Sequence, residues 1–321
     1  MRNGLYGIFK FQIYGIPVVG YDICGFNDNS WDTPCARWMS LGAFFPFARN
    51  HNSKGFIPQE PFAFGPYSRT ISSSKIALNM RYILWRYFYT EIFKISIGKK
   101  GAFFKPVFFE YYSDKNAYEN VDESFMLGEA LIVYPLFSDS IEDINVYMPK
   151  GDWYIFPSGE MIRNKTEGGK KIKLSGDYNN INIFMGGGYI LPFHDSFSKF
   201  IPNTHQLNEE FAELIIIPDF RDYSAKGYLI FDDDSYDTLE TNNYYHINIK
   251  FKYSKLVFDI VEKMKNSYNN TDIFVSKLKF LNMKYLLDEE EKYDILMITY
   301  RDGKISKSAL NIKIIIKLKL I

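Results

Sequence analysis

The sequence predicts an α/β region followed by β domains, and three patterns carry this prediction. Residues 16–19 form a short apolar run between two glycines, which is typical of a strand buried on both faces of a parallel sheet. Apolar residues then recur at helical spacing from about residue 72 to 97. After about residue 122, strand-length segments separated by turn residues replace the helical pattern.

Length and charge limit the classes of function. With 321 residues, of which 46% are hydrophobic and 18% aromatic, the chain can bury a substantial core and suits two or three domains. Lysine plus arginine equals aspartate plus glutamate at 38 each, so no net charge attracts nucleic acid or an anionic membrane. No apolar stretch reaches the roughly 18 residues that span a bilayer. Residues 1–15 do not resemble a signal peptide, because Lys10 and Gln12 interrupt their apolar run.

The most informative stretch is residues 15–62. Directly after the predicted buried strand come Asp22, Cys24, Gly25 and Phe26. Polar and aromatic side chains therefore gather at the carboxyl end of a strand, and in α/β barrels that end carries the chemistry.

Helices and a loop are predicted around this stretch. Thr33 and Pro34 indicate a helix start, because proline is tolerated in the first turn, and this helix is expected to end near residues 44–46. Residues 49–66 contain three prolines and are predicted to form a surface loop. The helical spacing of residues 72–97 leaves lysine and arginine side chains free to point outward.

The second half of the chain is predicted to be β structure. The segments are residues 125–137, 144–160 and 181–193, followed by the alternating runs 212–220, 227–234, 244–253 and 312–321. Trp153 and Tyr154 are interpreted as core residues rather than a sugar platform. The acidic runs 232–234 and 288–292 are interpreted as solvated turns rather than a metal site.

The stretch 15–62 closely resembles the family-31 glycoside hydrolases, which are retaining α-glucosidases and their relatives. The matching pieces are GIPVVGYDICGF, then CARWMSLGAFFPFARNHN, then QEPF, in the family's order and near its spacing. Tyr21 stands where the family usually has a small residue, and it is expected to tighten the pocket. PVFFEYY, residues 106–112, resembles the family's last barrel strand.

The resemblance implies three domains. Residues 1–121 would be the C-terminal part of a (β/α)8 TIM barrel, containing strands 7 and 8 with their helices. Residues 122–200 would form a proximal and residues 201–321 a distal antiparallel β-sandwich. Met1 would then fall near the end of the helix before strand seven, so the chain resembles the carboxyl-terminal part of a longer enzyme.

The resemblance also implies a substrate site without its catalytic pair. The nucleophile and the acid/base of the family are aspartates on barrel strands four and six, expected upstream of Met1, and neither the W-x-D-M-N-E nor the G-D-N context occurs here. His51 matches a histidine that hydrogen-bonds sugar hydroxyls. Asp22 is expected to accept from a hydroxyl or hold an arginine, and Phe26 to form an apolar wall. Arg49 either orients acidic pocket residues or makes a structural ion pair. No metal or cofactor is expected.

The two cysteines allow alternatives. Cys24 and Cys35 are too few for a disulfide scaffold and fit no zinc motif, so the residues alone favour two buried free thiols. The resemblance instead implies a disulfide between them, because secreted and lysosomal members bridge the matching positions. Sequons at Asn164 and Asn269 are compatible with a secretory route, lysosomal or extracellular.

Three hypotheses follow. The first is a family-31 α-glucosidase that hydrolyses terminal α-glucosidic bonds of oligosaccharides by a retaining double displacement. This chain would be a fragment of it, inactive alone. The second is a noncatalytic carbohydrate-binding remnant, and the third is a truncated nonfunctional product. Other catalytic classes are disfavoured, because G-x-S-x-G, H-E-x-x-H and P-loop motifs do not occur.

Overall fold

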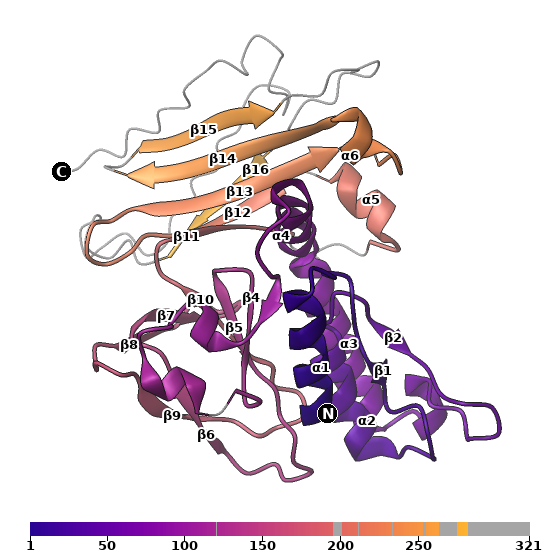
Figure 1. Cartoon of the computed structure of the whole chain (residues 1–321). Helices are drawn as coiled ribbons and strands as arrows, with labels where there is room; N and C mark the ends of the chain where they lie inside the picture. The colour runs from indigo at the N-terminus through magenta and orange to yellow at the C-terminus, as the bar shows by residue number, and fades with distance from the viewer. Residues whose placement is uncertain are drawn as a thin grey trace. The chain divides into compact units, whose positions relative to one another are not determined.

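A computed structural model describes residues 1–119, 121–194, 201–210, 212–232, 234–252, 255–262 and 275–281 (Figure 1). These residues divide into two compact units. The first unit contains residues 1–82 and 98–185, and the second contains residues 83–97 and the described residues from 186 onward. The predicted segment 312–321, the acidic run 288–292 and the Asn269 sequon lie outside the described residues.

The first unit opens with helices. α1 (Arg2–Ile13) buries Leu5, Ile8, Phe9 and Gln12, which recur every three or four residues and so form one face of the helix. The helix that was predicted to start at Thr33 and Pro34 is confirmed as α2 (Asp32–Gly42). The predicted helix over residues 72–97 is two helices, which are separated at Leu84: α3 (Arg69–Ile83) belongs to the first unit and α4 (Trp85–Gly98) to the second. No helix among the described residues is long and apolar enough to cross a membrane.

The predicted buried strand at residues 16–19 is wrong. Ile16 and Val18 are 47% and 56% exposed, and the nearest strand is β1, which consists of Asp22 and Ile23 alone. β1 has one partner, β2 (Arg49–Asn50), to which it runs parallel. A strand buried on both faces needs layers above and below it, and the described chain does not supply them at residues 16–19. β2 begins inside the segment that was predicted to be a surface loop.

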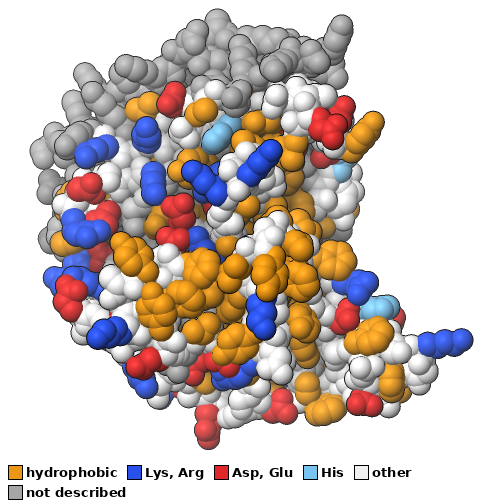
Figure 2. Space-filling view, viewed as in Figure 1, with side chains coloured by type: hydrophobic (Ala, Val, Ile, Leu, Met, Phe, Trp, Pro, Cys, Tyr) orange, Lys and Arg blue, Asp and Glu red, His pale blue; other side chains and the backbone are white. Residues whose placement is uncertain are grey.

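Apolar side chains are exposed in this region. The exposed residues of α1 and the segment after it are Tyr6, Phe11, Ile13, Tyr14, Ile16 and Val18. Figure 2, which presents one face of the molecule, shows hydrophobic side chains that gather over α1. Exposed apolar patches are typical of surfaces that bind a protein, a membrane or a ligand.

The predicted barrel strand at residues 106–112 is also wrong. The chain forms β3 at Phe104–Lys105, and a 3₁₀ turn, η2 (Val107–Phe109), follows it. β3 pairs antiparallel with β4 (Phe125–Leu127), so it belongs to the sheet of the following β region. Pro106 has no N–H to donate to a sheet ladder, which accounts for the strand ending at Lys105.

β structure is confirmed in the described residues from 122 onward. The larger sheet of the first unit has the order β3-β4-β5-β10-β7-β8, and β6 pairs separately with β9. Its further strands are β5 (Leu131–Tyr134), β6 (Ile144–Met148), β7 (Gly151–Ile155), β8 (Met161–Asn164), β9 (Lys170–Leu174) and β10 (Asn182–Gly186). Trp153 and Tyr154 are each 1% exposed, so their assignment to the core is confirmed.

The second unit is built on one six-stranded sheet of order β15-β14-β13-β11-β12-β16. Its elements are β11 (Tyr189–Phe193), α5 (Thr204–Glu209), β12 (Ala212–Ile217), β13 (Ala225–Asp232), α6 (Thr238–Thr241), β14 (Tyr244–Lys252), β15 (Lys255–Glu262) and β16 (Val275–Phe280). β11 pairs parallel with β13, and β12 with β16, so this sheet is mixed rather than wholly antiparallel. α4 packs on it through Phe93, whose ring lies 5.1 Å from that of Tyr244.

A buried arginine joins the helical and β parts of the first unit. Arg37, on α2, is 2% exposed. Its guanidinium donates to the carbonyl oxygens of Ser138, Ser140 and Gly176 at 2.9, 2.8 and 2.7 Å. It also lies 3.7 Å from the ring of Tyr178. Burial lowers the pKa of Arg37, while Tyr178 and nearby carboxylates favour the charged form.

Replacing Arg37 by a side chain without donors is expected to destabilise the first unit. Arg37→Met would leave buried carbonyls unpaired, so the free energy of unfolding should fall by about 3 kcal/mol. Urea-induced unfolding followed by tryptophan fluorescence measures this. The control is Arg69→Met, because Arg69 also lies over the Tyr178 ring, at 4.9 Å, but is exposed. Equal, small effects of the two substitutions would contradict the role of Arg37 in joining the helical and β parts of the first unit.

The sequon at Asn164 is closed by the fold. Asn164 is 2% exposed, and its Nδ2 donates to the carbonyl oxygens of Met148 and Pro149 at 2.9 and 3.1 Å. A glycan is attached at this same nitrogen, so it would take one of these protons and require space that the core occupies.

Folded protein produced in a glycosylating secretory host is therefore expected to carry no glycan at Asn164. Glycopeptide mass spectrometry checks this. The positive control is Ile181→Thr, which completes a sequon at the exposed Asn179 in the same unit. Folded, secreted chain with a glycan at Asn164 would refute the prediction.

Candidate active site

Two parallel strands bring the predicted site residues together. β1 and β2 pair so that Asp22 lies opposite Arg49 and Ile23 opposite Asn50. Because the strands run the same way, the residues that follow them, Phe26 and His51 among them, leave from one edge. Arg49 Nη2 contacts Asp22 Oδ1 at 2.8 Å, and their side chains are 51% and 28% exposed. An ion pair this exposed contributes little stability, but it does fix the orientation of the carboxylate.

The second pair in the cluster is aromatic. The rings of Phe26 and His51 lie 5.3 Å apart, centre to centre, at an interplanar angle of 37°. The N–H of Ser53 donates to the carbonyl oxygen of Phe26 at 2.9 Å, so the segment after β2 also holds the segment after β1. Phe26 is 41% exposed and His51 is exposed as well, so this edge is open to a ligand.

A disulfide fixes the turn that follows β1. Cys24 is bonded to Cys35 on α2, which confirms the pairing implied by the family resemblance. Cys24 and Gly25 both have positive φ, 71° and 93°, so the chain turns sharply between the strand and Phe26. The disulfide therefore ties this turn to the first turn of α2.

Two glycines allow the close approach of the segments around the site. A Cβ at Gly42, the last residue of α2, would lie 2.4 Å from Ile23 Cδ1. A Cβ at Gly20 would lie 1.8 Å from the carbonyl oxygen of Phe47, which is backbone and cannot move aside alone. Gly20 therefore lets the segment before β1 pack directly on the segment before β2.

Asp32 joins the starts of α2 and α3. Its carboxylate accepts from the N–H groups of Arg69 and Thr70 at 3.1 and 2.8 Å, and from the Thr70 hydroxyl at 2.8 Å. Desolvation on its own raises the pKa of Asp32, but the hydrogen bonds from Thr70 and Arg69 outweigh it and leave the pKa lowered. The charged form therefore secures the amino end of α3.

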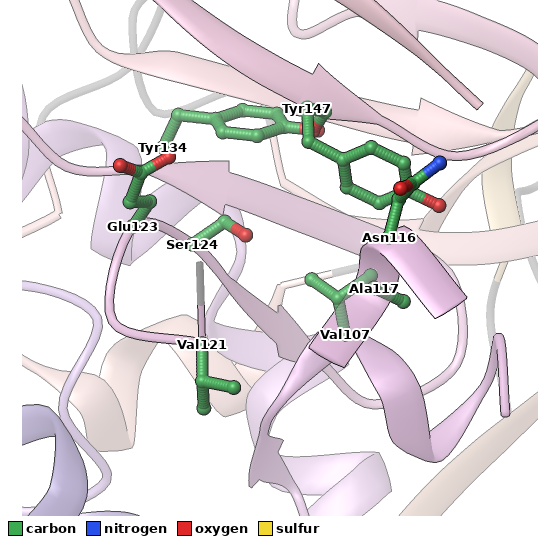
Figure 3. Close-up of a pocket in the computed structure, with 8 residues that line it drawn as sticks. All are labelled: Val107, Asn116, Ala117, Val121, Glu123, Ser124, Tyr134 and Tyr147. Carbon is green, nitrogen blue, oxygen red and sulfur yellow. The ribbon is translucent and has the colours of Figure 1, made fainter. Parts of the chain in front are cut away.

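A separate cavity in the first unit is too small for a sugar. It measures about 10 Å³ and is lined by Val107, Asn116, Ala117, Val121, Glu123, Ser124, Tyr134 and Tyr147 (Figure 3). Such a space suits a single water molecule. Burial, the largest cause for both phenols, raises the pKa of Tyr134 and Tyr147, so neither titrates near neutral pH. Across the described residues, no three His, Cys, Asp or Glu side chains are placed to hold a metal.

Comparison with known families decides the classification. The model of the "Glycosyl hydrolases family 31 TIM-barrel domain" matches residues 1–91, and that of the "Glycosyl hydrolase family 31 C-terminal domain" matches residues 101–191. Together they match more than half of the chain, in the family's domain order. The chain belongs to glycoside hydrolase family 31.

Individual relatives agree with this membership. This family-31 chain is 34% identical to a human protein named probable maltase-glucoamylase 2 over 77% of the chain and 9% of the relative. It is 31% identical to human intestinal sucrase-isomaltase over 88% of the chain and 15% of the relative. Its fold is similar to that of a glucosidase II alpha subunit crystallised with Tris, at a TM-score of 0.77 and 21% identity, over 95% of this chain and 34% of the other. The chain thus spans a minor part of these proteins.

The family-31 cluster also depends on a residue that sequence reasoning left without a role. Gln59, the first residue of the QEPF motif, is 4% exposed and lies between the two strands. The sequence did contain a signal for it, because Gln59 lies in QEPF, one of the pieces that match the family. Glu110, which lies near the carboxyl end of the mispredicted strand 106–112, pairs with Lys105 at 2.5 Å and takes no part in the contacts of the cluster.

Tyr21, where the chain departs from the family pattern, packs beside α1. A Cβ at Gly4 or Gly7 of α1 would lie 3.3 or 2.7 Å from the Tyr21 ring, so two glycines accommodate the larger side chain. The large residue at position 21 is therefore matched by small residues, Gly4 and Gly7, in the same chain. Whether Tyr21 tightens a sugar pocket stays a prediction.

The approach at Gly20 is expected to be intolerant of any side chain. Gly20→Ala should force β1 and β2 apart and lower the free energy of unfolding of the first unit by about 2 kcal/mol. Urea unfolding measures the change. Gly98→Ala is the matched control, because a Cβ there meets Lys100 Cγ at an ordinary 3.7 Å. A Gly20→Ala protein as stable as the control would show that this contact is not needed.

Proposed function

We propose that this chain is part of a retaining α-glucosidase that removes terminal glucose from α-linked oligosaccharides. One observation carries the proposal. In a family-31 chain, Asp22, Phe26, Arg49 and His51 form two contacting pairs at the edge of two parallel strands. The names of the relatives, maltase-glucoamylase and sucrase-isomaltase, support glucosidic substrates.

Each member of the cluster has a role suited to binding a sugar. His51 donates a hydrogen bond to a hydroxyl of the sugar undergoing cleavage. Asp22, oriented by Arg49, accepts from another hydroxyl. Phe26 presents an apolar face to the C–H surface of the ring. The contact between Phe26 and His51 keeps the apolar wall and the polar donor adjacent.

The bond-breaking carboxylates belong to another part of the enzyme. Retaining hydrolysis needs two carboxyl groups about 5 Å apart, one as nucleophile and one as acid/base. The family's sequence contexts for both do not occur in these 321 residues. We therefore propose that residues 1–321 alone are inactive, and that further barrel strands cover the apolar surface beside α1. The chain spans 9% and 15% of its two human relatives, which leaves ample sequence for those strands.

Domain organisation and compartment follow the same proposal. Residues 1–121 would complete a TIM barrel, and residues 122–200 and 201–321 would form proximal and distal β-sandwich domains. The Cys24–Cys35 disulfide supports a secretory compartment, lysosomal or extracellular, because disulfides persist where conditions are oxidising.

The proposal predicts an inactive chain and an active longer product. Purified residues 1–321 should not release the chromophore from a chromogenic α-glucoside between about pH 4 and 7, where carboxylates titrate. A transcript whose reading frame adds the two aspartate motifs should yield an enzyme that does. Turnover by the chain alone that disappears in Asp22→Asn would overturn the proposal. Saturable glucose binding without turnover in every product would favour the carbohydrate-binding remnant.

His51 is expected to matter for catalysis in the active longer product. His51→Ala should lower kcat/KM by an amount equivalent to roughly 2 to 4 kcal/mol of transition-state stabilisation, because the hydrogen bond to the sugar strengthens as the ring flattens toward the transition state. The melting temperature should stay near that of the parent. His205→Ala is the control, since His205 is exposed in the second unit. Full activity, or simple unfolding, would point to a structural role for His51.

A further inference from the structure

The amide of Gln59 lies among acceptors from both sides of the candidate site. Gln59 Nε2 is 3.2 Å from the carbonyl oxygen of Ile23, 3.1 Å from that of Gly25 and 2.9 Å from Asn50 Oδ1. The first two acceptors belong to β1 and the turn after it, and the third belongs to β2. One buried side chain therefore bridges the two segments that carry the cluster.

The bridge is reinforced through the backbone of the same residue. Asn50 Nδ2 donates to the Gln59 carbonyl oxygen at 2.8 Å, so Gln59 and Asn50 exchange two hydrogen bonds. All three neighbours of Nε2 are acceptors, and a flipped amide would set an oxygen against them. This fixes which end of the amide faces the strands.

The other end of the amide shows what this arrangement costs. Gln59 Oε1 is buried and has no hydrogen-bond partner among the described residues. A buried acceptor without a partner is destabilising, and native proteins keep few of them.

We propose that Gln59 is a positioning residue of the sugar site, and this rests on the function proposed above. Its amide binds the Gly25 carbonyl oxygen and the Asn50 side chain together. Because Phe26 follows Gly25 and His51 follows Asn50, this contact also holds Phe26 and His51 near each other. The 5.3 Å spacing between the two rings then depends on the Gln59 amide rather than on the rings themselves. Gln59 itself contacts no sugar. It sets the distance between the apolar wall and the hydrogen-bond donor of the pocket.

The test removes the amide while keeping its bulk. Gln59→Met preserves the length of the side chain and abolishes its hydrogen bonds. The matched control is Gln12→Met, because Gln12 is 3% exposed in the same unit and its amide donates to the Pro17 carbonyl oxygen at 2.7 Å and accepts from Phe103 N–H at 3.0 Å. Both substitutions should lower the melting temperature, so stability alone does not separate them.

The separating measurement is NMR of the full chain with labelled phenylalanine and histidine. The nuclear Overhauser effect between the Phe26 and His51 rings should be present in the parent and in Gln12→Met, and lost in Gln59→Met. If the effect persists in folded Gln59→Met, the proposal is overturned.

A second variant keeps the proposal testable if Gln59→Met does not fold. In Gln59→Glu the carboxylate cannot donate, but its protonated form donates one hydrogen bond. The ring contact should therefore be weaker at high pH, where the carboxylate prevails, and should recover at low pH, where the carboxyl group is protonated. The parent, measured at the same pH values, is the control for any effect of pH on the rest of the chain. A contact in Gln59→Glu that follows the parent at both pH values overturns the proposal.

Glucose binding separates this proposal from the function on which it rests. In the longer product that carries the two aspartate motifs, the Kd for glucose should rise at least tenfold in Gln59→Met and change little in Gln12→Met. Unchanged affinity despite a lost ring contact overturns the positioning role. A longer product that binds no glucose counts against the proposed function, and the ring contact in the chain itself then decides whether Gln59 places the two side chains.

Discussion

The candidate site depends on a parallel pairing of only two residues per strand. So short a pair offers few backbone hydrogen bonds, and contacts with neighbouring segments therefore stabilise the pairing of β1 with β2. The disulfide ties the turn after β1 to α2, and Gln59 binds both strands from one side. Gly20 and Gly42 remove the atoms that would keep the neighbouring segments apart. Each of these supports lies in the stretch 15–62.

Buried and half-buried arginines bind the irregular backbone in both units. Carbonyl groups in loops have no ladder partner, and a buried one needs a donor. Arg81, on α3, donates to the carbonyl oxygens of Ala43 and Phe45, both at 2.7 Å. Arg86, on α4, donates to those of Leu207 and Asn208 in the second unit, both at 3.0 Å. Burial lowers the pKa of Arg81 and of Arg86 to about 10, which leaves both charged at neutral pH.

These arginines join segments that are far apart in the sequence. Arg37 reaches from α2 to residues more than a hundred positions later, and Arg86 reaches from α4 to the end of α5. A guanidinium can do this because it presents several donors in one plane, and a lysine could not replace that geometry. The helices are therefore fixed to the β regions by hydrogen bonds that no local pattern reveals.

The sequence by itself determined the family, the helices and the β character of the second half. The motif residues from Asp22 to His51, the 3.6-residue spacing of apolar positions and the strand-length segments between turn residues are local signals. α2, β5 and β7 followed them, whereas the single helix predicted over residues 72–97 is divided into α3 and α4. The disulfide followed from the resemblance, and not from the cysteines alone, which favoured free thiols.

Only the tertiary structure decided how these local elements are completed. The apolar run at residues 16–19 looks like a buried strand, but burial requires neighbours that the described chain does not place there. The aromatic run at residues 106–112 has high β propensity, yet Pro106 and the pairing of Phe104 with Leu127 end the strand earlier. Likewise, a glutamine has no spacing that announces three acceptors from two strands. Propensity acts between neighbours in sequence, whereas strand pairing and the satisfaction of buried polar groups depend on residues that only folding brings together.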